Sequence, residues 1–131
     1  MQIGVNTLLW TAGFSEAHLP LIAKSKELGM DGIELATFDF ASFPAAAARR
    51  ELEAQKVPAT LCSALVAGMS LATEDAALRA QSLEFLKAGV RTTAEAGLSL
   101  FLGPFCSAVG FLPGRRRTES RPFSTEIEFA S

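Results

Sequence analysis

The fold is decided by the stretch Gly32-Ile33-Glu34-Leu35, a short apolar run with the length and composition of a buried strand. Runs of the same kind recur at Ile3–Asn6, Ala59–Cys62 and Leu98–Phe101, and stretches with helical character separate them. A repeated strand–helix unit predicts a parallel sheet whose functional residues lie at the carboxyl ends of the strands. We therefore expect an α/β protein built like the first four strands of a (β/α)8 barrel.

The bulk composition indicates a globular protein of one domain or half of one. The chain has 131 residues, whereas a closed (β/α)8 barrel needs about 250. The net charge of −2 disfavours a nucleic-acid partner, which would require a basic face. We expect no membrane association and a cytoplasmic location, because neither a long apolar span nor a secretion signal is visible. Cys62 and Cys106 form no CxxC motif, so neither a zinc site nor a redox pair is predicted.

Three helices are expected between and after the strands. The first follows a predicted N-cap at Ser15 and ends at Gly29, with Pro20 tolerated near its first turn. The second is predicted over Pro44–Gln55, and the third runs from Thr73 to Gly97. The side chains expected to share the buried face of this third helix are Leu78, Phe85, Leu86, Val90 and Thr93.

The texture of the sequence changes after Gly110, where a polar segment without helical period begins. We expect residues 1–119 to form the barrel part and residues 120–131 to be a divergent, disordered tail. Arg115–Arg117 could attract a phosphate, since guanidinium groups offer a planar fork of donors. A solvated loop is the favoured interpretation, because the chain has no Gly-rich phosphate loop.

Four segments carry a resemblance to a known family: Ile3–Trp10, Leu28–Glu34, Gly103-Pro104 and Pro113–Arg117. On these residues the chain resembles the sugar phosphate isomerase/epimerase family, which has the xylose isomerase-like TIM barrel. It looks most like the tagatose/psicose 3-epimerases within that family. The resemblance covers about residues 1 to 119 and implies a partial TIM barrel made of the first four strands and three helices.

The resemblance also implies a cofactor and a reaction. Members of the family use a divalent ion, commonly manganese, magnesium or cobalt, and two glutamates that move a proton on a ketose or related hydroxy-carbonyl sugar. Their metal ligands, two Glu, one Asp and one His, come from the second half of the barrel. No catalytic or metal-binding residue is therefore carried over to this chain. A truncated or frameshifted reading of a longer gene would explain the departure from the family pattern from Ser120 onward.

The residues that can be carried over belong to the sugar pocket, because the family lines it with residues that follow the early strands. The expected substrate-binding residues are Asn6, Trp10, Glu34, Cys62, Ser63, Gly103 and Pro104.

Each of the more distinctive side chains also has a plain structural interpretation. Trp10 is either a wall for a sugar ring or a packing residue, and the two are weighted equally. For Glu34 and Cys62 the structural roles, backbone binding and burial, are favoured over catalysis. His18 is expected to be solvated or to cap a helix rather than to bind metal. A barrel endonuclease is disfavoured, because metal-binding histidines are absent after the third and fourth strands.

Two functional hypotheses follow. In the first, the chain is the N-terminal fragment of a sugar isomerase/epimerase and is inactive alone, because the acid/base pair and the metal site are missing. In the second, it is a non-catalytic half-barrel that assembles with itself or with a separate C-terminal half. The second hypothesis rests on the open edges of a four-stranded sheet, which favour homo-oligomers or aggregation.

Overall fold

The computed structural model describes residues 1–110. Its elements, in chain order, are β1 (Gly4–Asn6), the 3-10 helices η1 (Thr7–Leu9) and η2 (Glu16–His18), α1 (Pro20–Glu27), β2 (Gly32–Ala36), α2 (Ala45–Gln55), β3 (Ala59–Cys62), α3 (Ala76–Glu95) and β4 (Phe101–Leu102). The predicted end of the barrel part at residue 119, the predicted tail over 120–131 and Arg115–Arg117 lie outside the described residues.

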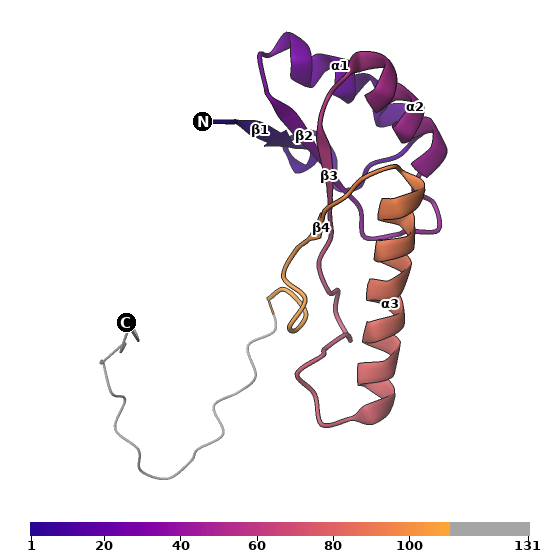
Figure 1. Ribbon diagram of the computed structural model, residues 1–131. Helices are drawn as coiled ribbons and strands as arrows, with labels where there is room; N and C mark the ends of the chain where they lie inside the picture. The colour runs from indigo at the N-terminus through magenta and orange to yellow at the C-terminus, as the bar shows by residue number, and fades with distance from the viewer. Residues whose placement is uncertain (111–131) are drawn as a thin grey trace, which may run out of the picture.

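The four strands form one parallel sheet in the order β1-β2-β3-β4, so that each strand pairs with its predecessor in the chain (Figure 1). Helices alternate with the strands as the repeated pattern predicts. This arrangement confirms the partial barrel. The fourth strand is shorter than expected, because only Phe101 and Leu102 pair with β3.

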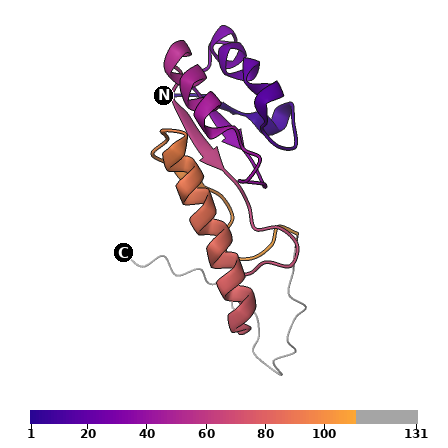
Figure 2. The same ribbon diagram turned by 90° about the vertical axis from the view of Figure 1, so that its right-hand side faces the viewer.

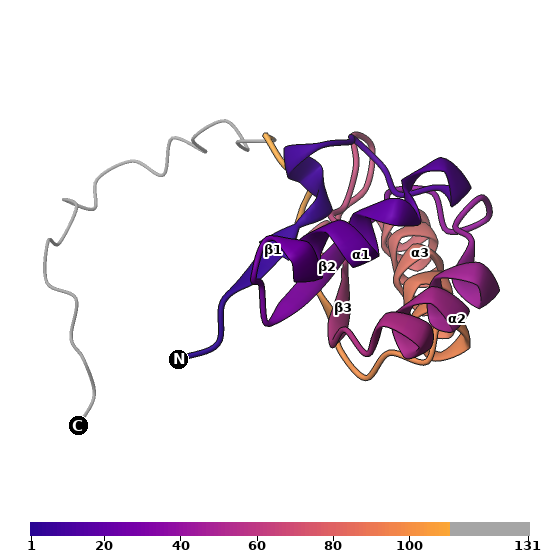
Figure 3. The same cartoon turned by 90° about the horizontal axis from the view of Figure 1, so that it is seen from above.

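The helices gather on one side of the sheet, as the view from above shows (Figure 3). Alternate strand residues point toward them, since successive side chains of a strand face opposite sides. Ile33, Leu35 and Leu61 are almost fully buried there and pack with Ile22 of α1 and Leu52 of α2. The opposite side of β1–β3 is covered by no helix within residues 1–110, and it would face the interior of a complete barrel.

The start of the first helical region follows the predicted capping pattern. Ser15 precedes η2, and its backbone N–H donates to Nδ1 of His18 at 3.0 Å. His18 therefore has the capping role favoured from the sequence. Pro20 occupies the first turn of α1, where its missing N–H costs no hydrogen bond.

Helix α3 is the longest helix of the described chain, and it runs well past the sheet (Figure 2). Its N-cap is Asp75, two residues after the predicted start at Thr73. The predicted buried face is wrong in part, because Val90 is 58% exposed and Gly89 faces inward instead. A Cβ on Gly89 would lie 2.9 Å from the ring of Phe40 and even closer to the ring of Phe101. Only glycine at this position therefore lets both rings pack against the helix. Within residues 1–110, no helix combines the length and the apolar character that a bilayer span requires.

Candidate functional site

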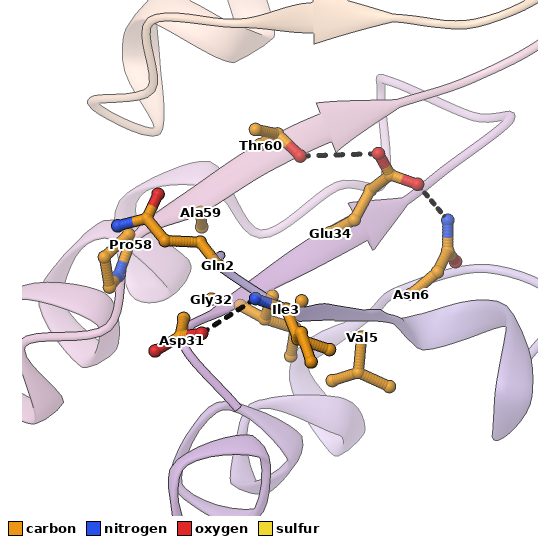
Figure 4. Close-up of a pocket in the computed structure, with 12 residues that line it drawn as sticks. Gln2, Ile3, Val5, Asn6, Asp31, Gly32, Glu34, Pro58, Ala59 and Thr60 are labelled. Carbon is orange, nitrogen blue, oxygen red and sulfur yellow. Dashed lines mark hydrogen bonds between the residues drawn. The ribbon is translucent and has the colours of Figure 1, made fainter. Parts of the chain in front are cut away.

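A polar network lies on the uncovered face of the sheet and joins three neighbouring strands (Figure 4). The carboxylate of Glu34 accepts from Nδ2 of Asn6 at one oxygen and from Oγ1 of Thr60, at 3.4 Å, at the other. Asn6 Nδ2 also lies 3.4 Å from Sγ of Cys62. The network therefore links β1, β2 and β3 through side chains alone.

Strand register explains why these side chains meet. Asn6 is paired with Glu34, and Glu34 is paired with Thr60, so the three residues stand side by side across the sheet. All three are half-buried and lie on the same face, opposite to the buried Ile33 and Leu35. A further hydrogen bond orients the side chain of Asn6, because its Oδ1 accepts from the backbone N–H of Leu8 at 2.7 Å.

A cavity of about 550 Å³ opens beside this network, at the carboxyl ends of β2, β3 and β4. Most of its wall is apolar, and Glu34 is the only carboxylate among the described residues that line it. The lining residues are Leu8, Glu34, Phe38, Cys62, Ser63, Ala64, Leu65, Val66, Ala67, Leu102, Gly103, Pro104 and Val109. Such a cavity, apolar with a few polar groups, is typical of a small-molecule site.

Two loops build the far wall of the cavity. The loop after β3 and the segment after β4 are joined by backbone hydrogen bonds, from Val109 to Leu65 at 3.2 Å and from Ala108 to Met69 at 3.1 Å. An antiparallel bridge between Ser70 and Ser107 continues the pairing. The wall is therefore tied by main-chain bonds rather than by side-chain packing alone.

The close approach of the two loops depends on Gly103. This residue has a φ of +152°, and an added Cβ would overlap with the carbonyl oxygen of Ser63 and lie 2.9 Å from its carbonyl carbon. The backbone N–H of Ser63 donates to the carbonyl of Leu102 at 3.1 Å in the same place. Glycine at 103 thus allows β3 and β4 to stay paired up to the cavity.

Two small polar groups at the end of β3 have distinct environments. The hydroxyl of Ser63 is buried and has no hydrogen-bond partner among the described residues. Burial raises the pKa of the Cys62 thiol, and the nearby Glu34 carboxylate raises this pKa further, while the hydrogen bond from Asn6 opposes the shift. Cys62 is therefore a protonated thiol at neutral pH, with little nucleophilic character.

The structure brings together most of the residues predicted to bind substrate. Glu34, Cys62, Ser63, Gly103 and Pro104 line the same cavity, and Asn6 joins it through its contact with Glu34. Glu34 lies inside β2 rather than after it.

Trp10 is the exception, because it does not line the cavity. Its ring is instead covered from α1, where the ammonium of Lys24 lies 5.4 Å from the ring centroid. This contact agrees with the second of the two interpretations given for Trp10, a packing residue. The role of Trp10 as a sugar wall stays a prediction.

Several residues of the site were not predicted from the sequence. Thr60 is the polar member of the network that was missed, although its position two residues before Cys62 on the same strand face was a usable signal. Phe38 and Val66 also line the cavity. They come from loops whose course follows from tertiary packing, so no local pattern pointed to them.

The described residues do not fit a metal ion on their own. Residues 1–110 contain no group of three or more His, Cys, Asp or Glu side chains that could hold one. Glu34 and Cys62 are two potential ligands, and their partners in the network are an amide and a hydroxyl. A site for Mn²⁺ or Mg²⁺ needs more oxygen ligands than this.

A curated protein and several solved structures are similar to most of this chain. No family model matches the sequence. A protein named "Probable ketose 3-epimerase" from Synechocystis sp. is 30% identical over 114 residues, which are 87% of this chain and 40% of that protein. The D-allulose 3-epimerase of Methylomonas sp. superimposes with a TM-score of 0.79 at 27% identity, over 87% of this chain and 40% of that enzyme.

This chain is similar to the N-terminal part of ketose 3-epimerases. The resemblance to the sugar phosphate isomerase/epimerase family is thereby confirmed. The chain spans 40% of the length of the curated relative that it matches. A second structure of the Methylomonas sp. enzyme, in complex with D-allulose, has a TM-score of 0.78 at 26% identity over 87% of this chain and 40% of that enzyme.

Proposed function

We propose that this chain forms the first half of the sugar pocket of a ketose 3-epimerase-type barrel. The observation that carries the proposal is the cavity at the carboxyl ends of β2–β4, which five of the predicted substrate-binding residues line. The similarity to an enzyme with bound D-allulose supports a ketose, or a related hydroxy-carbonyl sugar, as the ligand class.

The wall of the cavity suits one side of a sugar. The apolar side chains of Leu8, Phe38 and Val66 can pack against the C–H groups of the ligand. Glu34 offers carboxylate oxygens for its hydroxyl groups. These residues bind and orient the ligand in our proposal.

The proposal assigns no proton transfer to this chain alone. Epimerisation removes a proton from carbon on one side of the sugar and returns one on the other, so it needs a base and an acid in reach of the same carbon. Glu34 is the only carboxylate among the described lining residues, and residues 1–110 hold no metal cluster. We propose that both acid/base groups and the divalent ion, Mn²⁺, Mg²⁺ or Co²⁺, belong to the second half of the barrel.

Sugar binding can be tested by NMR titration of the purified chain with D-allulose. We expect weak binding that shifts the amide signals of Cys62, Ser63 and Gly103. Val66→Trp should abolish these shifts because it fills the cavity from an exposed wall position, whereas Val90→Trp, on the outside of α3, should leave them unchanged. Shifts that are absent, or that survive Val66→Trp, would contradict the pocket.

Inactivity can be tested separately. The purified chain, incubated with D-allulose and Mn²⁺, is expected to produce no D-fructose above the protein-free control. Metal-dependent turnover that scales with the concentration of the chain would refute the assignment of the proton-transfer groups to the other half.

A further inference from the structure

One backbone contact fixes the orientation of the Asn6 amide. Its Oδ1 accepts from the backbone N–H of Leu8 at 2.7 Å, and a backbone N–H can only donate. The amide oxygen must therefore face Leu8, and the NH2 group must face the sheet. The two orientations that an asparagine amide can take about its last bond are thereby distinguished.

The NH2 group of Asn6 faces two titratable side chains. It donates to Oε1 of Glu34 on β2, and Sγ of Cys62 on β3 lies 3.4 Å from the same nitrogen (Figure 4). Burial raises the pKa of the Cys62 thiol, and the hydrogen bond from Asn6 opposes this shift, as a donor at this position does. Asn6 is therefore a fixed donor between an acid and a thiol.

Asn6 can act on the cavity at the carboxyl ends through its neighbours. It does not line this cavity, whereas Glu34 and Leu8, which its amide joins, both do. Glu34 forms no ion pair with any of the described residues, so the neutral donors Asn6 and Thr60 set the direction of its carboxylate. Each carboxylate oxygen accepts one of these bonds and keeps a second lone pair for a ligand hydroxyl.

We propose that Asn6 is a positioning residue of the sugar pocket, which holds the Glu34 carboxylate in the direction that receives the ligand. The inference rests on the function proposed above and deepens it. In this role Asn6 acts through Glu34, in place of the direct contact with the substrate that the sequence predicted. A carboxylate that is already held loses little freedom when the sugar binds, so the Asn6 donor raises affinity without touching the ligand.

Asn6→Asp tests this role because it removes the donor and keeps the cap. Aspartate accepts from the Leu8 N–H as asparagine does, so η1 keeps its N-cap. The atom that faces Glu34 becomes an acceptor, and two carboxylates that share a site take up a proton as the pH falls. In the NMR titration with D-allulose, we expect this variant to bind about tenfold more weakly at pH 8 than at pH 5.5, whereas the parent chain binds alike at both.

Two further variants make the pH profile specific. Gln81→Glu adds the same charge at an exposed position of α3 and should leave the affinity independent of pH. The double variant Asn6→Asp/Glu34→Gln has a single carboxylate in the pair, so the pH dependence should disappear. Circular dichroism verifies that every variant is folded. Equal affinity of Asn6→Asp at the two pH values, or a pH dependence that persists in the double variant, would overturn the inference.

A second readout does not depend on sugar binding. Asn6→Asp removes a donor to Cys62 and adds a negative charge beside it, and both changes raise the pKa of the thiol. Iodoacetamide should therefore modify Cys62 more slowly than in the parent chain at pH 8, with the exposed Cys106 as the reference. If the parent chain does not bind D-allulose, the proposed function fails and this inference fails with it. If the parent chain binds and Asn6→Asp shows no slowing at Cys62, the inference alone fails.

Discussion

Replacing Gly103 with alanine should destabilise the chain by about 2–6 kcal/mol. A Cβ at this position would overlap with the backbone carbonyl of Ser63, and no side-chain rotation can relieve a contact between two main chains. Holding alanine at a φ of +152° costs about 1–3 kcal/mol. The overlap itself is relieved only if the two backbone segments move apart. This movement breaks the hydrogen bonds from Ser63 to Leu102 and from Leu65 to Pro104, which adds about 0.5–1.5 kcal/mol each.

Urea denaturation measures this loss directly. The chain has one tryptophan, Trp10, whose fluorescence reports unfolding together with far-UV circular dichroism. The matched control is Gly13→Ala, because Gly13 does not have a positive φ and no atom lies within 4 Å of its added Cβ. This control should change the free energy of unfolding by less than about 0.5 kcal/mol. If Gly103→Ala unfolds at the same urea concentration as the parent chain, the close approach of β3 and β4 described above is incorrect.

Three further predictions concern the core, the longest helix and the polar network. Leu61→Ala should cost about 2–5 kcal/mol in urea denaturation, because Leu61 is fully buried in the middle strands and leaves a cavity; a loss below about 1 kcal/mol would contradict this packing. Asp75→Ala should cost about 1 kcal/mol by removing the cap of α3, and Asp75→Asn should restore most of it. Glu34→Gln should lower the pKa of Cys62, because the carboxylate of Glu34 raises it, and iodoacetamide should therefore modify Cys62 faster at pH 8. Mass spectrometry measures the rate of modification, with the exposed Cys106 as the internal reference. An unchanged rate would contradict the electrostatic coupling between Glu34 and Cys62.

The order of the strands and most helix positions were predictable from the sequence, because they follow from local patterns. The second helix begins at Ala45, one residue after the predicted Pro44, and ends at Gln55 as predicted. The buried face of α3 was harder to predict. Val90 fits an apolar stripe, yet the aromatic rings beside the helix leave room only for small residues such as Gly89, and that constraint comes from distant parts of the chain.

The candidate site shows the same division. The ends of the strands were predicted, so Cys62, Ser63 and Gly103 were placed near one another correctly. Phe38 and Val66 reach the cavity from loops, and the orientation of Trp10 toward Lys24 depends on a side chain of α1. Loop courses and ring orientations depend on packing between elements that are distant in sequence.

The agreement between strand order and chain order has a consequence for synthesis on the ribosome. Each strand pairs with the strand that precedes it in the chain and has already been synthesised, so the sheet can grow by one strand at a time while the chain leaves the ribosome. At every stage, the most recently formed strand exposes backbone N–H and C=O groups that stay without a partner until the next strand forms. We therefore expect holding chaperones to bind nascent chains of this type at the most recently formed strand, and β4 is the last of the described strands to form.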